Sequence, residues 1–269
     1  MPLKRLLRQL FPAVAPRWPA PPRLSLEPGP DLIYAIGDVH GCLDLLQGLE
    51  RQIAEDAADT PGDRLIVMLG DLIDRGPASA EVIEHMQAPP PAGFRRLCLR
   101  GNHEQMLLGF LRQQRDGAVW LANGGWKTIA SYGASPTEMA AASGRRAAVD
   151  LLLRYIPHEH IDWLSGLPVL IETPEVIFAH AGIRPGVAIA DQTDDDLMWF
   201  RDDYADDFAS ARRTVVHGHT PRDEPLVTPF RIAIDTGACL TGKLTAVRLA
   251  RGQPPALLST SGSRLQIYK

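Results

Sequence analysis

Hydrophobic and polar residues follow one another in a unit that occurs three times in the first part of the chain. Each unit has an apolar run, then a Gly-Asp or Gly-Asn turn, then a segment whose apolar residues have helical spacing. The apolar runs cover residues 32–36, 65–69 and 94–99, and the helical segments cover about 42–56, 78–87 and 104–115. This order predicts a βαβαβα arrangement, which requires a parallel sheet with right-handed crossovers. Ligands of such a sheet bind beyond the carboxyl ends of its strands.

The pattern changes after residue 115. Residues 116–166 combine helical and irregular stretches around a turn at Asn123-Gly124-Gly125, and we interpret them as an inserted cap. Strand-like runs return at residues 168–171, 175–179, 214–217, 231–235, 244–249 and 265–268. The fold class is therefore expected to be α/β, with a largely β second half.

The first 30 residues differ from the rest of the chain. Six prolines lie between Pro12 and Pro28, and five basic residues precede the first acid, Glu27. We predict a basic, proline-rich tail over residues 1–30 and a folded domain over residues 31–269. The apolar spacing within residues 1–12 also fits a short amphipathic helix on an anionic membrane surface, although a frayed tail is the simpler interpretation.

Composition and charge exclude several broad classes of protein. The hydrophobic share of 45% and the charged share of 22% are those of a globular protein. With 28 Lys and Arg against 32 Asp and Glu, the net charge is -4, so we expect no nucleic-acid partner. No run reaches the roughly 18 apolar residues of a membrane span. Cys42, Cys98 and Cys239 form no paired motif and fit reduced thiols, which leads us to expect a cytoplasmic protein.

Five short polar motifs follow apolar runs and carry the candidate chemistry. Each motif alone fits an ordinary turn or helix N-cap. Together, their aspartates, asparagine and histidines supply the mixed oxygen and nitrogen donors that bind a pair of divalent cations. A purely structural role for all of them would leave many buried polar groups without partners. In chain order the motifs are Gly37-Asp38-Val39-His40-Gly41, Gly70-Asp71-Leu72-Ile73-Asp74-Arg75-Gly76, Gly101-Asn102-His103-Glu104, His180-Ala181-Gly182 and His217-Gly218-His219.

The strings GDVHG, GDLIDRG, GNHE, HAG and HGHT, in this order, resemble the phosphoprotein phosphatase branch of the calcineurin-like metallophosphoesterases over residues 32–250. The nearest likeness is to small bacterial and phage serine/threonine protein phosphatases. The resemblance implies a central β-sandwich flanked by helices, with residues 31–269 as the catalytic domain. It also implies two divalent metal ions at the sheet edge, with manganese expected and iron or zinc as alternatives.

The same resemblance assigns the metal ligands. His217 lies two positions before His219, where related sequences tolerate an aromatic residue, and it is expected to be a neighbour of the site and not a ligand. Related phosphodiesterases and nucleases carry a further histidine where this chain has Pro221, which argues for phosphomonoester chemistry. The implied ligands are Asp38 and His40 for the first ion, Asp71 as the bridge between both ions, and Asn102, His180 and His219 for the second.

Hydrolysis without a covalent intermediate is the chemistry expected from such a centre. Two cations about 3.5–4 Å apart lower the pKa of a bridging water, so that hydroxide can attack phosphorus in line with the leaving oxygen. Arg75 and, by resemblance, Arg201 are expected to hold the phosphoryl oxygens, although either could form a surface ion pair instead. His103 is expected to protonate the leaving alkoxide while Asp74 orients its ring; a helix cap is the simpler alternative.

These features predict a metal-dependent serine/threonine phosphoprotein phosphatase whose partner is a phosphorylated protein or peptide. The alternative is a diadenosine-polyphosphate hydrolase, which has the same metal motifs and would use the cap to hold a nucleotide, so that a dinucleoside polyphosphate would be its partner. An alternative of another class is a non-catalytic scaffold of the same fold, and the intact motifs argue against it.

Several weaker signals allow more than one interpretation. Trp120 and Trp126, on either side of the glycine-rich turn, fit either stacking on a substrate ring or packing against the body. Residues 191–207 are rich in aspartate around Arg201, as expected of a solvated face or of a surface that attracts cationic peptides. Asp235 ends another strand and fits either a turn or a support for the metal histidines.

Overall fold

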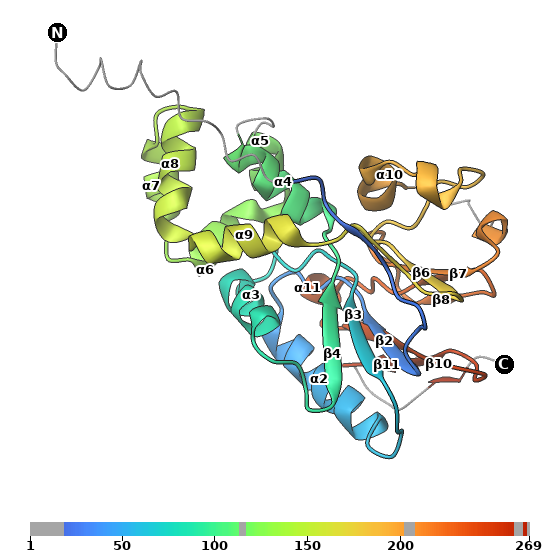
Figure 1. The fold of residues 1–269 in the computed structure, drawn as a ribbon. Helices are drawn as coiled ribbons and strands as arrows, with labels where there is room; N and C mark the ends of the chain where they lie inside the picture. The colour runs from blue at the N-terminus through green and yellow to red at the C-terminus, as the bar shows by residue number, and fades with distance from the viewer. Residues whose placement is uncertain (1–18, 113–116, 202–207, 261–265, 268–269) are drawn as a thin grey trace, which may run out of the picture.

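Two six-stranded sheets form the centre of the molecule (Figure 1). The computed structural model describes residues 19–112, 117–201, 208–260 and 266–267. One sheet has the strand order β12-β11-β10-β2-β3-β4 and the other has the order β1-β5-β6-β7-β9-β8. The α/β class and the sandwich expected from the sequence are confirmed.

The three repeated units form the parallel part of the first sheet. β2 (Leu32–Ile36), β3 (Arg64–Met68) and β4 (Phe94–Cys98) pair in parallel. Each is followed by its expected helix, namely α2 (Leu43–Asp56), α3 (Ser79–Gln87) and α4 (Asn102–Leu111). α4 begins two residues earlier than expected, because a glycine precedes it and the Glu104 side chain caps its first turn. The early start puts Asn102 on the helix itself.

Antiparallel strands complete this sheet. β10 (Thr245–Ala250) pairs with β2 and with β11 (Ala256–Ser259), which in turn pairs with β12 (Gln266–Ile267). The sequence pattern indicates β10 and β12 but not β11.

The second sheet contains β5 (Leu170–Glu172), β6 (Val176–Phe178), β7 (Thr214–His217), β8 (Leu226–Val227) and β9 (Arg231–Ala233).

The start of the folded body differs from the sequence-based expectation. β1 (Arg23–Ser25) lies before residue 31 and pairs in parallel with β5, so that Leu24 is the register partner of Ile171. Leu24 and Leu26 also pack against the core between the sheets. Three residues among prolines and charges are too few to show the alternation of a strand. The helix considered for residues 1–12 lies outside the described residues.

The strands bury side chains on both faces. Ile33 and Ala35 of β2 point into a cluster between the sheets, which also contains Phe178 of β6 and Val216 of β7. The alternate residues of β2 face α2, α3 and the cap. Burial on both faces explains why the parallel strands are continuous apolar runs in the sequence.

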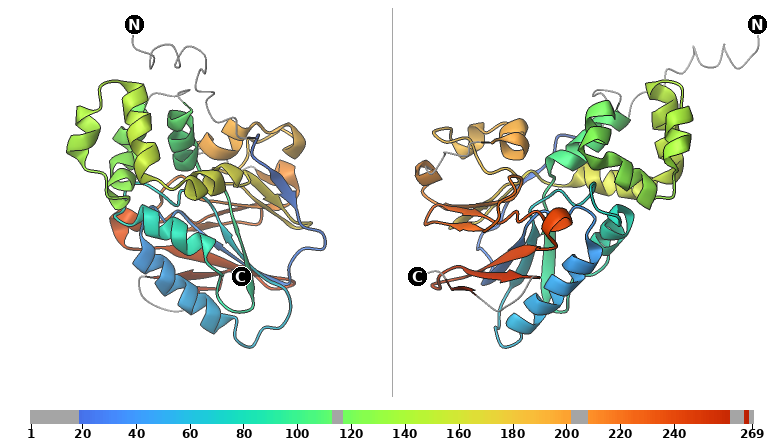
Figure 2. Two further views of the ribbon diagram at one scale, coloured as in Figure 1. Left: turned by 60° about the vertical axis from the view of Figure 1, so that its left-hand side comes forward. Right: turned by 180° about the vertical axis from the view of Figure 1, so that it is seen from behind.

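Most of the helices that follow β4 gather at one end of the sheets, whereas α2 and α3 lie against the face of the first sheet (Figures 1 and 2). Of the cap that the sequence indicates over residues 116–166, the described residues 117–166 are largely helical. On the other side of this end lie η2 (Ile189–Asp191), α10 (Asp194–Trp199) and η3 (Phe208–Ala211), while α11 (Ala238–Thr241) follows β9. The cap contains α5 (Gly117–Trp120), η1 (Leu121–Gly125), α6 (Trp126–Ser131), α7 (Pro136–Ala141), α8 (Arg145–Tyr155) and α9 (His158–Gly166).

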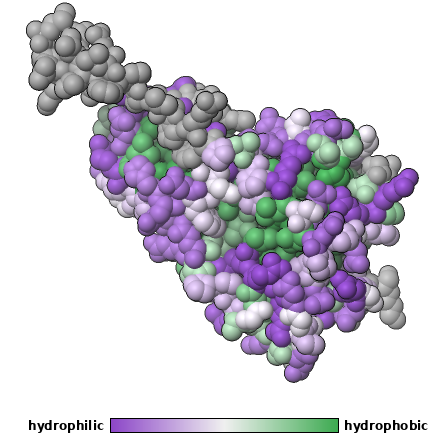
Figure 3. Space-filling view, in the orientation of Figure 1, coloured by the Kyte–Doolittle hydropathy of each residue, from purple (hydrophilic) through white to green (hydrophobic). Residues whose placement is uncertain are grey.

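The surface seen in Figure 3 is covered mainly by hydrophilic residues, with apolar residues in smaller patches. Among the described residues no helix is both long enough and apolar enough to cross a bilayer. Part of the acidic segment is paired with the body, since Asp194 contacts Arg23 at 3.2 Å and Asp196 contacts Arg184 at 2.6 Å. Residues 202–207 of that segment lie outside the described residues.

Candidate metal centre

The six residues implied as metal ligands come from the carboxyl ends of strands in both sheets. In the first sheet, the ligand-bearing turns follow β2 and β3, and α4 follows β4; in the second sheet, the histidines follow β6 and β7. Parallel strands end at the same edge, so residues far apart in the sequence meet there. All six side chains are buried: Asp38, His40, Asp71, Asn102, His180 and His219.

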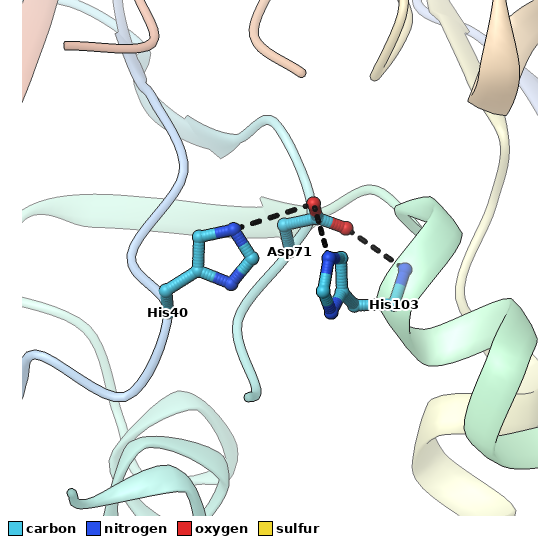
Figure 4. A group of neighbouring side chains, drawn as sticks. All are labelled: His40, Asp71 and His103. Carbon is cyan, nitrogen blue, oxygen red and sulfur yellow. Dashed lines mark hydrogen bonds and ion pairs between the residues drawn. The ribbon is translucent and has the colours of Figure 1, made fainter. Parts of the chain in front are cut away.

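One group of donor atoms lies on the side of the first sheet (Figure 4). His40 Nε2 is 3.5 Å from Asp71 Oδ2, and His103 Nε2 is 3.8 Å from the same oxygen. The candidate ligand atoms of these three residues all lie within 4.8 Å of one another. The structure therefore brings His103, expected to be the proton donor, into the same cluster as the implied ligands.

A second group lies on the side of the other sheet. His180 Nε2 is 3.4 Å from Asp71 Oδ1, and His219 Nδ1 is 2.9 Å from Asn102 Oδ1. The candidate ligand atoms of Asp71, His180 and His219 again lie within 4.8 Å of one another. Asp71 thus turns one carboxylate oxygen to each group, which is the placement expected of a bridging ligand.

The hydrogen bonds of His180 support the idea of a cation in the second group. Its Nδ1–H donates to the Leu69 carbonyl at 2.9 Å, which leaves a lone pair on Nε2. Burial lowers the pKa of His180 to about 4, so Nε2 carries no proton at neutral pH. This nitrogen nevertheless lies 2.9 Å from Asn102 Oδ1, which is also an acceptor. Two acceptor atoms at this spacing fit the coordination of one shared cation.

Three buried carboxyl groups, those of Asp38, Asp71 and Asp235, lie near one another at the centre. Burial raises the pKa of Asp38, and the neighbouring Asp235 and Asp71 carboxylates raise it further. Asp38 accepts the backbone N–H of His219 with both oxygens, at 3.2 and 3.1 Å. Asp235 Oδ2 is buried without any hydrogen-bond partner, although Oδ1 accepts the Gly237 N–H. Clustered carboxylates and an unpartnered oxygen fit divalent cations.

Divalent cations bound to these groups would supply an activated water and would neutralise phosphoryl charge. Backbone carbonyl groups orient two of the histidines so that each Nε2 faces the centre. His40 Nδ1–H donates to Ile73 O at 2.8 Å, as His180 Nδ1–H does to Leu69 O. The donor set supports divalent metal ions in general, while manganese remains a prediction.

Both arginines predicted to hold phosphate reach the donor groups. Arg75 donates from Nη1 to His40 Nε2 at 2.9 Å and from Nη2 to His103 Nε2 at 3.0 Å. Arg201 donates from Nε to His219 Nε2 at 3.0 Å. The two guanidinium groups therefore approach different sides of the centre, where each can turn toward an anionic substrate.

Left-handed backbone conformations are concentrated at the centre. Of the six described non-glycine residues with positive φ, all but Arg212 belong to the site. Such conformations cost free energy and persist only where the surroundings enforce them. The five site residues, with their φ values, are His40 (45°), Asp71 (50°), Asp74 (72°), Arg75 (65°) and His219 (67°).

Glu104 has a role that its motif alone does not indicate. Its fully buried carboxylate accepts the backbone N–H groups of Gly101 at 2.8 Å and Asp71 at 3.0 Å through Oε2, and those of Leu72 at 2.8 Å and Ile73 at 3.3 Å through Oε1. It therefore holds the turn that carries the implied bridging ligand. Its place three residues after Gly101, as in a capping box, was the available signal.

The predicted pair of His103 and Asp74 is present. His103 Nδ1 is 2.6 Å from Asp74 Oδ2, and the Asp74 side chain is fully buried. Burial raises the pKa of Asp74 to about 7, whereas hydrogen bonds from Thr128 and Trp120 oppose that shift. Trp120 is 1% exposed, so it cannot stack on a substrate ring; this interpretation of Trp120 is wrong because its indole is buried against Asp74.

His217, which we expect to be a neighbour of the site and not a ligand, forms its ring hydrogen bonds with residues other than the implied ligands. Its Nδ1–H donates to Gly218 O at 3.0 Å, and its Nε2 accepts a hydrogen bond from Arg231 Nε at 3.0 Å. Both ring nitrogens therefore have protein partners. Its ring packs edge-on against Phe208, with ring centroids 5.9 Å apart.

Comparison with known proteins identifies the family. A family model described as calcineurin-like phosphoesterase matches residues 32–238. The asymmetrical bis(5'-nucleosyl)-tetraphosphatase PrpE of Bacillus cereus is 29% identical over 232 residues, which cover 79% of this chain and 88% of that relative.

Two solved structures show the same fold. One is a candidate diadenosine tetraphosphatase with a TM-score of 0.60 and 22% identity, covering 91% of this chain and all of its own. The other is a protein serine/threonine phosphatase from Saccharomyces cerevisiae with a TM-score of 0.54 and 13% identity, covering 91% of this chain and 84% of its own. At these identities the likeness establishes the fold alone.

Proposed function

Because the chain belongs to the calcineurin-like phosphoesterase family, we propose that it is a metal-dependent hydrolase that cleaves dinucleoside tetraphosphates asymmetrically. Water adds to one phosphoanhydride: its oxygen bonds to phosphorus, the bridging P–O bond breaks, and the products are a nucleoside triphosphate and a nucleoside monophosphate. This is the diadenosine-polyphosphate alternative from the sequence. The observation that carries it is the similarity to PrpE, which extends over 88% of that relative.

The cap offers a surface suited to a nucleobase. Trp126 is 48% exposed and lines a cavity of about 280 Å³ with Leu121, Ile129, Met139 and Ala140. The Lys127 ammonium lies 4.3 Å from the centre of the Trp126 ring. Base stacking on an aromatic side chain contributes about 1–3 kcal/mol. An exposed indole within an apolar cavity therefore supports a substrate that carries a planar base.

A short turn just before Trp126 contacts Arg75 of the metal centre. Gly124, two residues before Trp126, accepts the Arg75 N–H through its carbonyl at 3.3 Å. The Arg75 guanidinium in turn contacts His40 and His103. A base on Trp126 and a phosphate on Arg75 would thus be held by neighbouring parts of the chain. Arg201, on the side of the second donor group, would hold another part of the phosphate chain.

A serine/threonine phosphoprotein phosphatase is the second candidate function, and one observation favours it. The leaving group of a dinucleotide is a phosphate oxygen, which needs little protonation, whereas the alkoxide of serine needs a proton donor. The hydrogen-bonded pair of His103 and Asp74 could supply the proton that the serine alkoxide needs. The relatives favour the dinucleotide over the phosphopeptide that the motifs led us to predict.

A parallel assay separates these functions. The full chain, loaded with manganese, is given diadenosine tetraphosphate, a phosphoserine peptide and 4-nitrophenyl phosphate, and the nucleotide products are separated by chromatography. We expect the dinucleotide to have the highest kcat/KM and to yield ATP and AMP in equal amounts. Faster hydrolysis of the peptide would replace the proposal with the second candidate. If the manganese-loaded protein hydrolyses none of the three substrates, the result would support the non-catalytic scaffold.

Replacing Trp126 tests the nucleobase contact. Trp126→Ala should raise KM for diadenosine tetraphosphate about tenfold, because one stacking contact is lost, and leave 4-nitrophenyl phosphate hydrolysis unchanged. Val119→Ala is a matched control, since Val119 is 55% exposed in the cap but does not line the cavity. An unchanged KM for the dinucleotide in Trp126→Ala would remove Trp126 from the binding site.

A further inference from the structure

The Asp74 carboxylate is held by three donors. Thr128 Oγ1–H donates to Oδ1 at 2.6 Å, and Trp120 Nε1–H donates to Oδ2 at 2.9 Å and lies 3.2 Å from Oδ1. The third donor is His103 Nδ1–H, at 2.6 Å from Oδ2. Both oxygens are thus occupied, and the plane of the carboxylate is fixed.

Two of these donors belong to the cap and not to the sandwich. Trp120 is the last residue of α5 and Thr128 lies in α6, 46 and 54 residues along the chain from Asp74. Asp74 and Thr128 have no exposed surface, and Trp120 is 1% exposed. Removal of either cap donor therefore leaves a buried carboxylate oxygen with one hydrogen bond fewer.

The cap also holds the backbone beneath this carboxylate. The Asp74 N–H donates to Thr128 Oγ1 at 2.9 Å, so one hydroxyl group contacts both the main chain and the side chain of Asp74. The next N–H, of Arg75, donates to Gly124 O. Because residues 74 and 75 both have positive φ, their conformation depends on such external contacts. The cap is thus in contact with Asp74 at several points.

We propose that Trp120 and Thr128 are positioning residues for proton transfer: by fixing the Asp74 carboxylate they hold the His103 ring with Nε2 directed toward the leaving oxygen. The cap is then part of the catalytic machinery as well as a cover for the substrate. The inference rests on the proposed phosphoester hydrolysis but not on the identity of the natural leaving group. For this step the His103 ring carries a proton on both nitrogens and Arg75 Nη2 turns from Nε2 toward the phosphoryl group. His103 then donates its Nε2 proton to the leaving oxygen as the P–O bond breaks, keeps Nδ1–H on Asp74, and takes a new Nε2 proton from solvent.

The expected consequence is a dependence on the leaving group. A basic leaving group such as phenoxide needs the proton, so its hydrolysis is sensitive to the orientation of His103. A strongly activated group such as 2,4-dinitrophenoxide departs without it. A purely structural role for the cap donors would instead lower the rates on both substrates by the same factor.

The test uses variants that remove one donor and keep the shape of the side chain. Trp120→Phe and Thr128→Val should each lower kcat on phenyl phosphate about tenfold, a part of the 10²–10⁴-fold that proton transfer contributes, with rates on 2,4-dinitrophenyl phosphate within about twofold. KM and metal content should not change. Thr128→Ser, which keeps the hydroxyl, should restore most of the rate. Trp163→Phe and Thr137→Val, elsewhere in the cap, serve as controls.

A double-mutant cycle shows whether the effect passes through Asp74. In an Asp74→Asn background, Thr128→Val should have no further effect on phenyl phosphate, because the carboxylate it orients is gone. Equal losses on both aryl phosphates, or full losses in the Asp74→Asn background, would overturn the proposal. These outcomes do not depend on whether the enzyme prefers a dinucleotide.

A spectroscopic measurement provides a readout without turnover. In the metal-free protein, the His103 Nδ1–H, bonded to Asp74 at 2.6 Å, should give a downfield proton resonance that His103→Asn abolishes. The resonance should move upfield in Thr128→Val and stay in place in Thr137→Val. An unchanged resonance in Thr128→Val would show that Thr128 does not control the orientation of the pair, even if the proposed substrate were correct.

Discussion

At the scale of single residues, Glu104 shows how one buried side chain determines the geometry of a site. Its carboxylate receives four backbone N–H groups from two separate segments, one around Asp71 and one at Gly101. No basic side chain is needed, because the amide dipoles compensate the charge. Its proposed contribution is therefore to place Asp71, and not to bind substrate.

Glu104→Gln should weaken both stability and metal binding. An amide has one acceptor oxygen, so its NH₂ group would face two backbone N–H donors, at a cost of about 2–4 kcal/mol. We expect the denaturant midpoint to fall and the metal content after dialysis to drop, as measured by elemental analysis. Glu138→Gln is the matched control, since Glu138 caps α7 in the same position but is exposed. Retention of two metal ions with normal stability would contradict this role.

His217 is a second single residue with a testable role. Its protonation should make the free energy of unfolding depend on pH. Burial, followed by the neighbouring Arg231 guanidinium, lowers its pKa to about 3 in the folded protein. In the unfolded chain the pKa of the His217 side chain is about 6.5. The neutral form therefore stabilises the folded state above pH 6.5, and this stabilisation is lost as the pH falls toward 3.

His217→Gln should therefore reduce the acid sensitivity of the metal-free protein. Between pH 7 and pH 5 the free energy of unfolding of the wild type should fall by about 2 kcal/mol more than that of the variant, as determined by urea unfolding at each pH. In a separate sample loaded with metal, the variant should bind as much metal as the wild type, because both ring nitrogens of His217 have protein partners. Parallel pH profiles would show that His217 does not titrate between the two states in this way.

At the scale of elements, the turn in η1 links the cap to the centre. Gly124 has φ 104°, and a Cβ atom there would lie 2.8 Å from Arg75 N and 2.9 Å from Arg75 Cγ. Only a glycine allows this approach without displacing the arginine. The turn thus determines where the Arg75 guanidinium lies relative to the donor groups.

Gly124→Ala should displace Arg75 and lower kcat/KM about tenfold or more on any phosphate substrate, because a charged contact to the phosphoryl group is weakened. Gly133→Ala is a matched control: Gly133 also has positive φ, 87°, but a Cβ atom there would meet no described neighbour within 4 Å. Steady-state kinetics of the two variants separate the clash from the backbone strain. Equal losses in both would argue against a specific effect on Arg75.

At the scale of the whole molecule, the implied ligands connect the two sheets. Asp38, His40 and Asp71 follow strands of one sheet, while His180 and His219 follow strands of the other. Metal ions held between them would bind the folded state and not the unfolded chain. Binding of this kind stabilises a protein by mass action.

Removal of metal should accordingly lower the unfolding temperature. Titration of manganese into chelator-treated protein should raise it, by an amount equivalent to about 2.7 kcal/mol per site at a hundred times the dissociation constant. Asp71→Asn should lose most of this shift, because a neutral amide is a poor bridge between two cations. Calorimetry measures both effects. A full shift in Asp71→Asn would contradict the bridging role.

The sequence by itself determined the parallel part of the first sheet and the polar residue types at its edge. Buried parallel strands require continuous apolar runs, and the turns after them carry the aspartates, asparagine and histidines, so both features are local in the chain. The three parallel strands and their helices are therefore predictable, whereas the ligand assignments are implied by the family resemblance and stay a prediction. β1 and β11 are too short or too weakly patterned to be recognised in this way.

Only the tertiary structure decided how these residues are held. No local pattern shows that Trp120 and Thr128 reach Asp74, that Glu104 binds the turn of Asp71, or that Trp120 is buried while Trp126 is exposed. Such contacts join segments tens of residues apart, and they depend on how the cap packs on the sandwich. The sequence motifs specify the residue types of the site, whereas the burial and orientation of their side chains depend on the packing of the whole chain.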